Sequence, residues 1–197
     1  MDWLKDLNFI QYILLGAGIV VLMYVIVLYN NLVTLKNNVS KAWANIDVLL
    51  KQRHEELPKL IATCKKYMEY EKGVLEKITE LRNAVNQFRA EGNIEGLGKA
   101  ETELRGVLGR LFALAENYPD LKTNQTFLHL QGRISSLENA IADRRELYNE
   151  SATINNIRIE QFPDMLVALL FRSKHRVLLE FTEEETGPVD VNALFKE

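Results

Sequence analysis

The stretch FIQYILLGAGIVVLMYVIVLY, residues 9–29, contains no charged side chain, and Gln11 is its only strongly polar residue. As an α-helix its 21 residues would extend ~31 Å, close to the ~30 Å thickness of the hydrocarbon core of a bilayer. Tyr12 and Tyr29 lie near its ends, where interfacial aromatic side chains are expected. We therefore predict a single transmembrane helix over residues 9–29, preceded by a short tail over residues 1–8.

A cleaved signal peptide and a buried core helix are the alternatives to a retained anchor. A signal peptide requires a basic start, a shorter apolar stretch and small residues at the cleavage site. Here Asp2, Lys5 and Asp6 precede the apolar stretch, and bulky residues end it. These features favour a retained, single-pass anchor in the cell membrane.

The basic residues around this stretch predict its orientation. Lys5 is the only basic residue before it, whereas Lys36 and Lys41, then Lys51 and Arg53, follow it. Because short loops rich in lysine and arginine tend to stay in the cytoplasm, we expect a short N-terminus outside the cell and a cytoplasmic bundle.

Apolar residues recur after residue 30 in steps of three and four, which indicates helices with one buried face. Pro58 interrupts the first series and either kinks a continuing helix or begins a new one. Beyond it the series resumes at Leu60 and continues to Phe88. The first series comprises Leu32, Leu35, Val39, Ala42, Ile46 and Leu49.

Turn signals divide the remainder into further helices. Gly92-Asn93 and Tyr118-Pro119 end two of them, and a last long helix runs to Phe162-Pro163. Helices joined by short turns pack antiparallel. We therefore expect an all-α fold, in which the transmembrane helix is followed by an elongated up-and-down bundle of three to four long helices over residues 30–162.

The length, charge and cysteine content of the chain limit the class of protein to which it can belong. Its 197 residues allow one domain and an anchor, because a single core usually accounts for ~100 to 200 residues. There are 24 lysines and arginines against 27 aspartates and glutamates, so no basic surface for nucleic acid is expected. The single cysteine, Cys64, cannot form an intramolecular disulfide.

The usual catalytic and metal-binding motifs are missing from the sequence. His54-Glu55 begins like the helix of a zinc protease, but Pro58 stands where the second histidine ligand would be. None of the three histidines follows a glutamate by three residues, as di-metal sites in helical bundles require. We therefore expect no catalytic residue, no metal ligand and no cofactor, and predict that the protein is not an enzyme.

Polar residues fall on the apolar series of the last helix. Steps of seven from Phe127 lead through Tyr148 to Asn155. The companion series from Leu130 leads to Arg144. Buried arginine and asparagine must be hydrogen-bonded, and such groups often fix the register of a helical assembly. We interpret Arg144, Tyr148 and Asn155 as candidate register or assembly residues; exposure to solvent and contact with a ligand are the alternatives.

Residues 163–176 combine apolar and basic side chains in a way typical of a membrane surface. An apolar group over residues 165–171 is followed directly by basic residues. Apolar side chains can enter the lipid boundary while cations meet anionic headgroups. We predict a short amphipathic segment; a helix that closes the end of the bundle is an equal alternative. The candidate membrane-surface contacts are Leu166, Leu169, Phe171, Arg172, Lys174 and Arg176.

The acidic C-terminal tail, residues 177–197, begins with an alternating pattern. Val177, Leu179 and Phe181 would lie on one side of an extended chain, which predicts a strand. Its backbone would have to pair with a short segment at residues 189–194 or with another molecule. A frayed tail is the alternative, because three consecutive glutamates repel one another.

An ordered set of short motifs runs through most of the chain. Its members are YNNLV at 29–33, AWANIDVLLKQRH at 42–54, Pro58, YPDLK at 118–122, Asn124-Gln125, Phe127, Leu130, Glu138, Arg144, Tyr148-Asn149, Asn155 and Phe162-Pro163. This set resembles the LemA family of bacterial membrane proteins, although Ile154 stands where that family often has an aromatic residue. The resemblance implies an N-terminal membrane helix, a helical bundle, a short tail outside and no established enzymatic activity.

Together these inferences predict a membrane-anchored helical scaffold or adaptor that acts by self-association and partner docking. The expected partners are membrane lipid, further copies of the chain and a membrane protein, not nucleic acid. An accessory subunit of a membrane enzyme or transporter is the alternative. An enzyme or metal protein with sparse ligands is a third reading.

Overall fold

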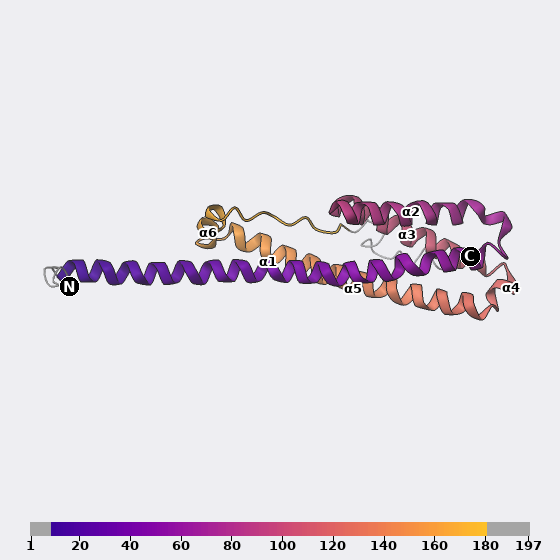
Figure 1. The fold of residues 1–197 in the computed structure, drawn as a ribbon, viewed down its shortest axis with the longest axis horizontal. Coiled ribbons are helices and arrows are strands. Elements are labelled where there is room, and N and C mark those ends of the chain that lie inside the picture. Colours follow the sequence, from indigo (N-terminus) through magenta and orange to yellow (C-terminus); the bar gives the residue numbers. More distant parts are fainter. Residues whose placement is uncertain (1–8, 181–197) are drawn as a thin grey trace, which may run out of the picture. The chain divides into compact units, whose positions relative to one another are not determined.

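The computed structural model describes residues 9–180, which form helices and connecting segments (Figure 1). No strand occurs in that part of the chain, so the predicted all-α fold is confirmed. The predicted N-terminal tail and the acidic tail beyond Glu180 lie outside it. The elements in order are α1 (Phe9–Cys64), the 3-10 helix η2 (Glu69–Glu71), α2 (Lys72–Glu91), α3 (Ile94–Ala115), α4 (Pro119–Lys122), α5 (Gln125–Glu160) and α6 (Asp164–Leu170).

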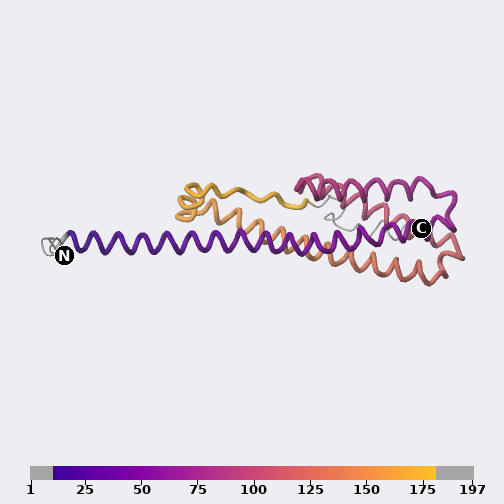
Figure 2. The backbone as a smooth tube through the Cα atoms, in the orientation of Figure 1, coloured from indigo at the N-terminus to yellow at the C-terminus, as the bar shows by residue number. Residues whose placement is uncertain are grey.

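The chain divides into two compact units. Among the described residues, unit 1 contains residues 9–41 and 150–176, and unit 2 contains residues 42–149 and 177–180. The tube in Figure 2 shows that α1 and α5, which contribute to both units, are each continuous. The predicted boundary between membrane helix and bundle at residue 29 therefore lies inside one unbroken helix.

Unit 2 is a bundle of four helices. They are the part of α1 from residue 42, α2, α3 and the part of α5 up to residue 149. Of these, α2 and α3 pack against each other as an antiparallel pair (Figure 1). The predicted bundle of three to four long helices is confirmed. Its fully buried apolar side chains include Ile46, Leu57, Leu60, Ile78, Leu104, Leu108, Leu111, Phe127 and Ile134.

Local hydrogen bonds and backbone conformation set the turns of unit 2. Gly92 ends α2 with a φ of +67°, a left-handed conformation that glycine adopts without steric cost. The side chain of Asn93 then caps α3 by accepting a hydrogen bond from the amide of Gly96 at 2.9 Å. Asn124 caps α5 in the same way, accepting from the amide of Phe127 at 3.0 Å.

The first helix passes through Pro58 and ends at Cys64. Because proline has no backbone N–H, the helical carbonyl four residues earlier, that of His54, loses its usual partner. In the structure, Nε of Arg82 on α2 donates to this oxygen at 3.1 Å. A tertiary hydrogen bond thus replaces the helical one, and of the two alternatives left open by the sequence, a new helix at Pro58 is wrong.

The reversal between α1 and α2 lies in residues 65–71, where the apolar series continues without a turn signal. Met68, in the middle of this reversal, is only 1% exposed. Its backbone, at φ −117° and ψ 59°, is not helical. The side chain therefore fills the bundle end and maintains the apolar pattern although the helix has already stopped.

Unit 1 has a small apolar core of its own. Leu28 and Leu32 of α1 pack with Ile159 of α5 and with Val167 and Ala168 of α6. These contacts fix α6 against both long helices of the unit. The short helix therefore lies beside the end of the predicted membrane span.

Candidate functional site

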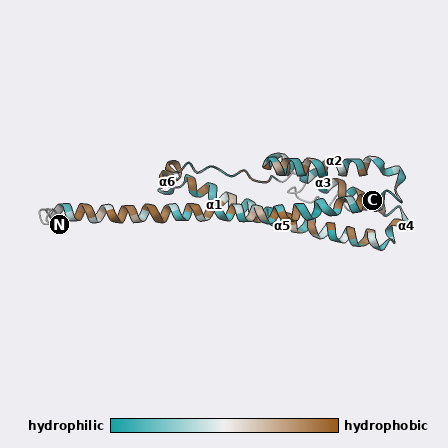
Figure 3. Ribbon diagram, in the orientation of Figure 1, coloured by the Kyte–Doolittle hydropathy of each residue, from teal (hydrophilic) through white to brown (hydrophobic). Residues whose placement is uncertain are grey.

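The apolar stretch at the start of α1 is exposed along most of its length. Leu14 is 65% exposed, Val20 66% and Met23 63%. Figure 3 shows this part of α1 in the brown of hydrophobic residues. By length and composition the helix can cross a membrane. Because soluble proteins rarely leave so large an apolar surface in water, the stretch fits a lipid environment.

The short helix α6 divides its side chains between the interior and the surface of unit 1. Val167 and Ala168 are buried, whereas Leu166 is 56% and Leu169 69% exposed. Phe171, directly after the helix, is 52% exposed. One side thus closes the unit and the other presents apolar side chains outward. The three exposed residues are placed as membrane-surface contacts require, and that role remains a prediction.

The basic residues after α6 line a cavity of about 300 Å³ within unit 1. Arg172, Lys174 and Arg176, all predicted as surface contacts, come from the segment after the helix. Lys36 of α1 adds a further cation that the sequence did not connect with them. Among the described residues that line the cavity, none is acidic. The arrangement is suited to an anion.

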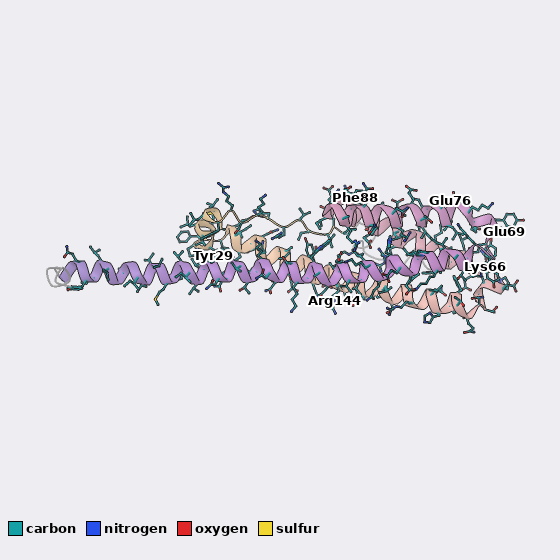
Figure 4. All side chains as sticks on the ribbon, viewed as in Figure 1. Tyr29, Lys66, Glu69, Glu76, Phe88 and Arg144 are labelled. Carbon is teal, nitrogen blue, oxygen red and sulfur yellow. The ribbon has the colours of Figure 1, made fainter. Side chains whose placement is uncertain are left out.

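Two aromatic rings form part of the wall of this cavity. Tyr29, labelled in Figure 4, stands at the end of the apolar stretch of α1. The centroid of its ring lies 4.4 Å from that of Phe171. Leu32 and Ile159 add aliphatic lining. The cavity therefore combines cationic and apolar surfaces.

Arg172 holds an unusual backbone conformation beside this cavity. Its φ is 52°, a left-handed value that glycine adopts freely and other residues adopt only with strain. Its N–H donates to the oxygen of Leu169 at 3.2 Å, and the N–H of Ser173 donates to that of Ala168 at 2.9 Å. This pattern ends a helix and normally places glycine at the left-handed position. Strain of this kind gathers at binding sites.

Two of the three candidate register residues lie on the buried side of α5. Tyr148 and Asn155 are each 4% exposed, and Tyr148 packs edge-on against the half-buried Trp43, with ring centroids 5.6 Å apart. Arg144, labelled in Figure 4, is exposed, and Arg145 is buried instead. The buried position predicted for Arg144 is wrong: from Leu137 the next buried residue of this series is Arg145, a step of eight, whereas the series from Phe127 keeps its steps of seven as far as Asn155. A register role for the other two remains a prediction.

The segment 173–180 is neither helix nor strand, and asparagines of α5 pair with its backbone. In unit 1, the side-chain amide of Asn156 donates to the oxygen of Arg176 and its oxygen accepts from the N–H of Arg176, both at 2.8 Å. In unit 2, Asn149 makes the same two bonds with Leu179, again at 2.8 Å. A side-chain amide has an N–H donor and a C=O acceptor arranged as in a peptide group. Each asparagine therefore makes the two hydrogen bonds that a residue of a neighbouring strand would make.

The expectation that the start of the tail must pair with another strand or another molecule is therefore wrong for the described residues. Besides the asparagine contacts, the hydroxyl of Tyr148 donates to the oxygen of Val177 at 2.8 Å. Leu179 is 2% exposed and lies against Gly98 of α3. The rest of the predicted strand and the segment 189–194 lie outside the described residues.

A buried ionic cluster joins three helices of unit 2. Arg53 of α1 is 1% exposed. Its guanidinium donates to Glu138 of α5 at 2.7 Å and to Glu101 of α3. Arg145 of α5 is also buried and acts electrostatically on Glu101. Two cations and two carboxylates thus offset one another where the helices meet.

Burial shifts the ionisation of this cluster. It raises the pKa of Glu101, because desolvation outweighs the attraction of Arg53. Burial alone would lower the pKa of Arg53, but the charges of Glu101 and Glu138 raise it overall. Sequence reasoning missed the cluster, although Arg53 stands seven residues after the buried Ile46. Removing one partner from such a cluster destabilises a fold far more than replacing all of it.

His54 and Cys64 occupy environments typical of structural residues. Nη2 of Arg82 lies 2.8 Å from Nε2 of His54, so this ring nitrogen accepts a hydrogen bond and the imidazole is neutral. Burial raises the pKa of the Cys64 thiol to about 12, which suppresses the reactive thiolate. Within residues 9–180, no group of three or more histidine, cysteine, aspartate or glutamate side chains could hold a metal ion.

A further cavity, of about 440 Å³, lies in unit 2 beside the end of α1 and the start of α2. Its charged lining comprises Lys65 and Lys72 with Glu69 and Glu76; Figure 4 labels the two glutamates. Equal numbers of cations and anions select for no particular class of ligand. The cavity of unit 1 is therefore the stronger candidate site.

Comparison with known proteins gives one consistent family. The sequence model of the LemA family matches residues 42–192. Protein LemA of Metamycoplasma hominis is 28% identical over 187 residues, covering 94% of this chain and 84% of that protein. Magnetosome protein MamQ 1 of Paramagnetospirillum magneticum and MamQ of Magnetospirillum gryphiswaldense are each 25% identical, covering 86% of this chain and 71% of each relative. None of these names states a chemical activity.

Proposed function

This chain belongs to the LemA family, and on that premise we propose that it is a membrane-anchored helical scaffold that acts by self-association and partner docking, without catalysis. The observation that carries the proposal is the exposed apolar stretch of α1, which is long and apolar enough to cross a membrane. The helices that follow it fill their interior with their own side chains. The exposed outer faces of these helices are then available for contact with partner proteins.

Extraction of membranes with alkaline carbonate tests the anchor. The full chain should stay in the membrane pellet, because ~20 apolar residues in a helix hold a protein in the bilayer against high pH. A variant that lacks residues 1–29 should move to the soluble fraction, except for molecules that α6 still holds at the membrane surface. Release of the full chain by carbonate would refute the anchor.

We place the short N-terminus outside the cell and the bundle in the cytoplasm. The support is the set of basic residues that follows the apolar stretch in the sequence. Because Cys64 is buried, a Cys64→Ser background with Asp2→Cys or Lys41→Cys gives one accessible thiol each. In intact spheroplasts, a membrane-impermeant maleimide should label the first variant and not the second. Labelling of the second variant but not of the first would show the opposite orientation.

A second groove in unit 1 supports self-association. It has a volume of about 470 Å³ and is lined by Leu35, Ile154 and Ile157 among others. The two isoleucines are 47% and 49% exposed. Anchored copies share one plane and one orientation, which raises their effective concentration. We therefore assign this groove to a second copy of the chain.

The test of this surface is a charge placed in the groove. Ile157→Glu should lower the mass of the complex extracted in mild detergent, because it places a charge on the apolar part of the groove. Arg158, which also lines the groove, is already paired with Asp164. Thr153→Glu is the matched control, since Thr153 is exposed on the same helix and does not line the groove. If both variants and the unchanged chain form complexes of equal mass, this groove is not part of the self-association interface.

A further inference from the structure

We propose that the cavity of unit 1 binds the phosphodiester headgroup of an anionic phospholipid. The inference rests on the proposed anchoring of α1, because it requires the cavity to lie at the membrane surface. The inference specifies the class of lipid that the cavity of unit 1 binds. Its volume of about 300 Å³ is at the small end of ligand sites, which suits a headgroup rather than a whole lipid.

The cations of the cavity lack counterions in the part of the chain that the structure describes. Nearby, Arg158 pairs with Asp164, and Nε2 of His175 lies 3.5 Å from a carboxylate oxygen of Glu160; neither contact engages the cavity's own cations. In addition, Nε of Arg176 is buried and has no hydrogen-bond partner there. Buried donors are nearly always satisfied. An anionic oxygen in the cavity would satisfy this one.

Position along α1 distinguishes a lipid headgroup from a soluble anion. Tyr29 ends the apolar stretch, and Lys36 lies seven residues, or ~10 Å, further along the helix. The headgroup layer begins where the hydrocarbon core ends and is ~5 to 8 Å thick on each side. Lys36 therefore lies ~2 to 5 Å beyond this layer, and its long side chain can extend back to a lipid phosphate. The rings of Tyr29 and Phe171 then face the boundary with the acyl chains, where aromatic side chains are favoured.

Compensation of the α6 dipole is the simpler explanation for cations after a helix. It accounts for Arg172 and its neighbours but not for Lys36, which comes from the middle of α1. It also does not account for a strained arginine where glycine would end the helix without strain. Both observations are explained if these side chains serve a bound anion.

Lipid titration of the full-length protein in maltoside micelles tests the proposal. The probes are dihexanoyl-phosphatidylglycerol, dihexanoyl-phosphatidylcholine, inorganic phosphate and a short polyglutamate peptide, with binding followed by native mass spectrometry and phosphorus NMR. Phosphatidylglycerol should bind most tightly. The double variant Lys174→Gln, Arg176→Gln should bind it about 25-fold more weakly, at about fivefold per lost cation. The control Lys41→Gln, Arg144→Gln removes two exposed cations outside the cavity and should bind it normally.

Arg172→Gly separates binding from folding. Glycine suits the left-handed backbone, so this variant should keep or raise the thermal midpoint while binding phosphatidylglycerol about fivefold more weakly. Unchanged affinity in this variant and in the double variant would overturn the proposal. So would phosphatidylcholine, inorganic phosphate or polyglutamate binding as tightly as phosphatidylglycerol. If lipid binding fails while carbonate leaves the chain in the pellet, only this inference falls; release by carbonate refutes the anchored scaffold itself.

Discussion

Nε of Arg82, on α2, donates at 3.1 Å to the main-chain oxygen of His54 on α1. This oxygen is the helical acceptor that Pro58 leaves without a donor. The contact explains how a helix of 56 residues continues past a proline. It also ties α2 to α1 near the end of the bundle.

Replacing Arg82 should therefore destabilise the bundle in a way that depends on Pro58. Arg82→Met leaves a partly buried carbonyl unsatisfied, which costs ~1 to 3 kcal/mol. In a Pro58→Ala background the alanine N–H can reach the same oxygen, so the cost should be smaller. A double-mutant cycle measured by denaturant unfolding gives the difference. Arg110→Met, an exposed arginine on α3, is the control, and strictly additive changes would contradict the proposed role of Arg82.

The stability of the protein should fall with pH below neutrality because of His54. Burial, followed by the charges of Arg82 and Arg89, lowers the pKa of His54 below its ordinary value of 6.5. Protonation then favours the unfolded chain, so this contribution is present above pH 6.5 and is lost as the pH falls through the lower, folded-state pKa.

Unfolding of the unchanged protein and of His54→Gln, at about pH 7.5 and about pH 5.5, isolates this effect. The variant should lose less stability on acidification. The raised pKa of Glu101 acts in the opposite direction, and it cancels in the comparison. His129→Gln, at an exposed position, should behave like the unchanged protein. Identical acid sensitivity in His54→Gln would disprove the assignment.

Loss of Arg53 should be among the most damaging single changes in the bundle. Arg53→Met leaves Glu101 and Glu138 without their shared guanidinium, and breaking a buried pair in this way costs ~3 to 5 kcal/mol. Adding Glu138→Leu should recover part of this loss, because Arg145 then faces Glu101 with balanced charge.

The control for this cluster is an exposed ion pair on the same helix. Lys51→Met breaks the pair of Lys51 with Asp47 at 2.9 Å and should cost ~1 kcal/mol or less. Denaturant midpoints of the variants give the comparison. A loss for Arg53→Met as small as that for Lys51→Met would mean that the cluster does not hold the three helices together.

The asparagine contacts predict protection of the segment after α6. Asn149→Leu removes both hydrogen-bond partners of the Leu179 backbone. The free energy of local opening should therefore fall by ~1 to 3 kcal/mol, and the amides around Leu179 should exchange hydrogen correspondingly faster. Hydrogen exchange measured by mass spectrometry on a peptide covering residues 173–180 reports this. Asn139→Leu, at an exposed position of α5, should leave the exchange unchanged. Equal exchange in both variants would show that Asn149 does not hold the segment.

The helices could be predicted because their signal is local. Steps of three and four follow from the geometry of a single helix, and Gly92 and Asn93 act on their immediate neighbours. The passage through Pro58 could not be predicted, because it depends on Arg82 from another helix. For the same reason the sequence did not reveal Arg53 as the buried partner of Glu138, 85 residues away.

The candidate site could be predicted only in part. The composition of residues 163–176 identified the basic side chains after α6, because apolar and basic groups adjoin there in the sequence. Their meeting with Lys36 and Tyr29 depends on packing between distant segments. Arg144 shows the limit of a seven-residue step, because the series from Leu130 takes a step of eight from Leu137 to the buried Arg145.

The mass of the complex extracted in mild detergent, with every protein that co-purifies, tests the central claim of a self-associating membrane scaffold most directly. We predict a mass, corrected for detergent and lipid, that is a multiple of the 22.7 kDa chain, with this chain as the only stoichiometric protein. A monomer, or one copy of the chain bound to one copy of a different membrane protein, would contradict it, and the second result would instead identify an accessory subunit.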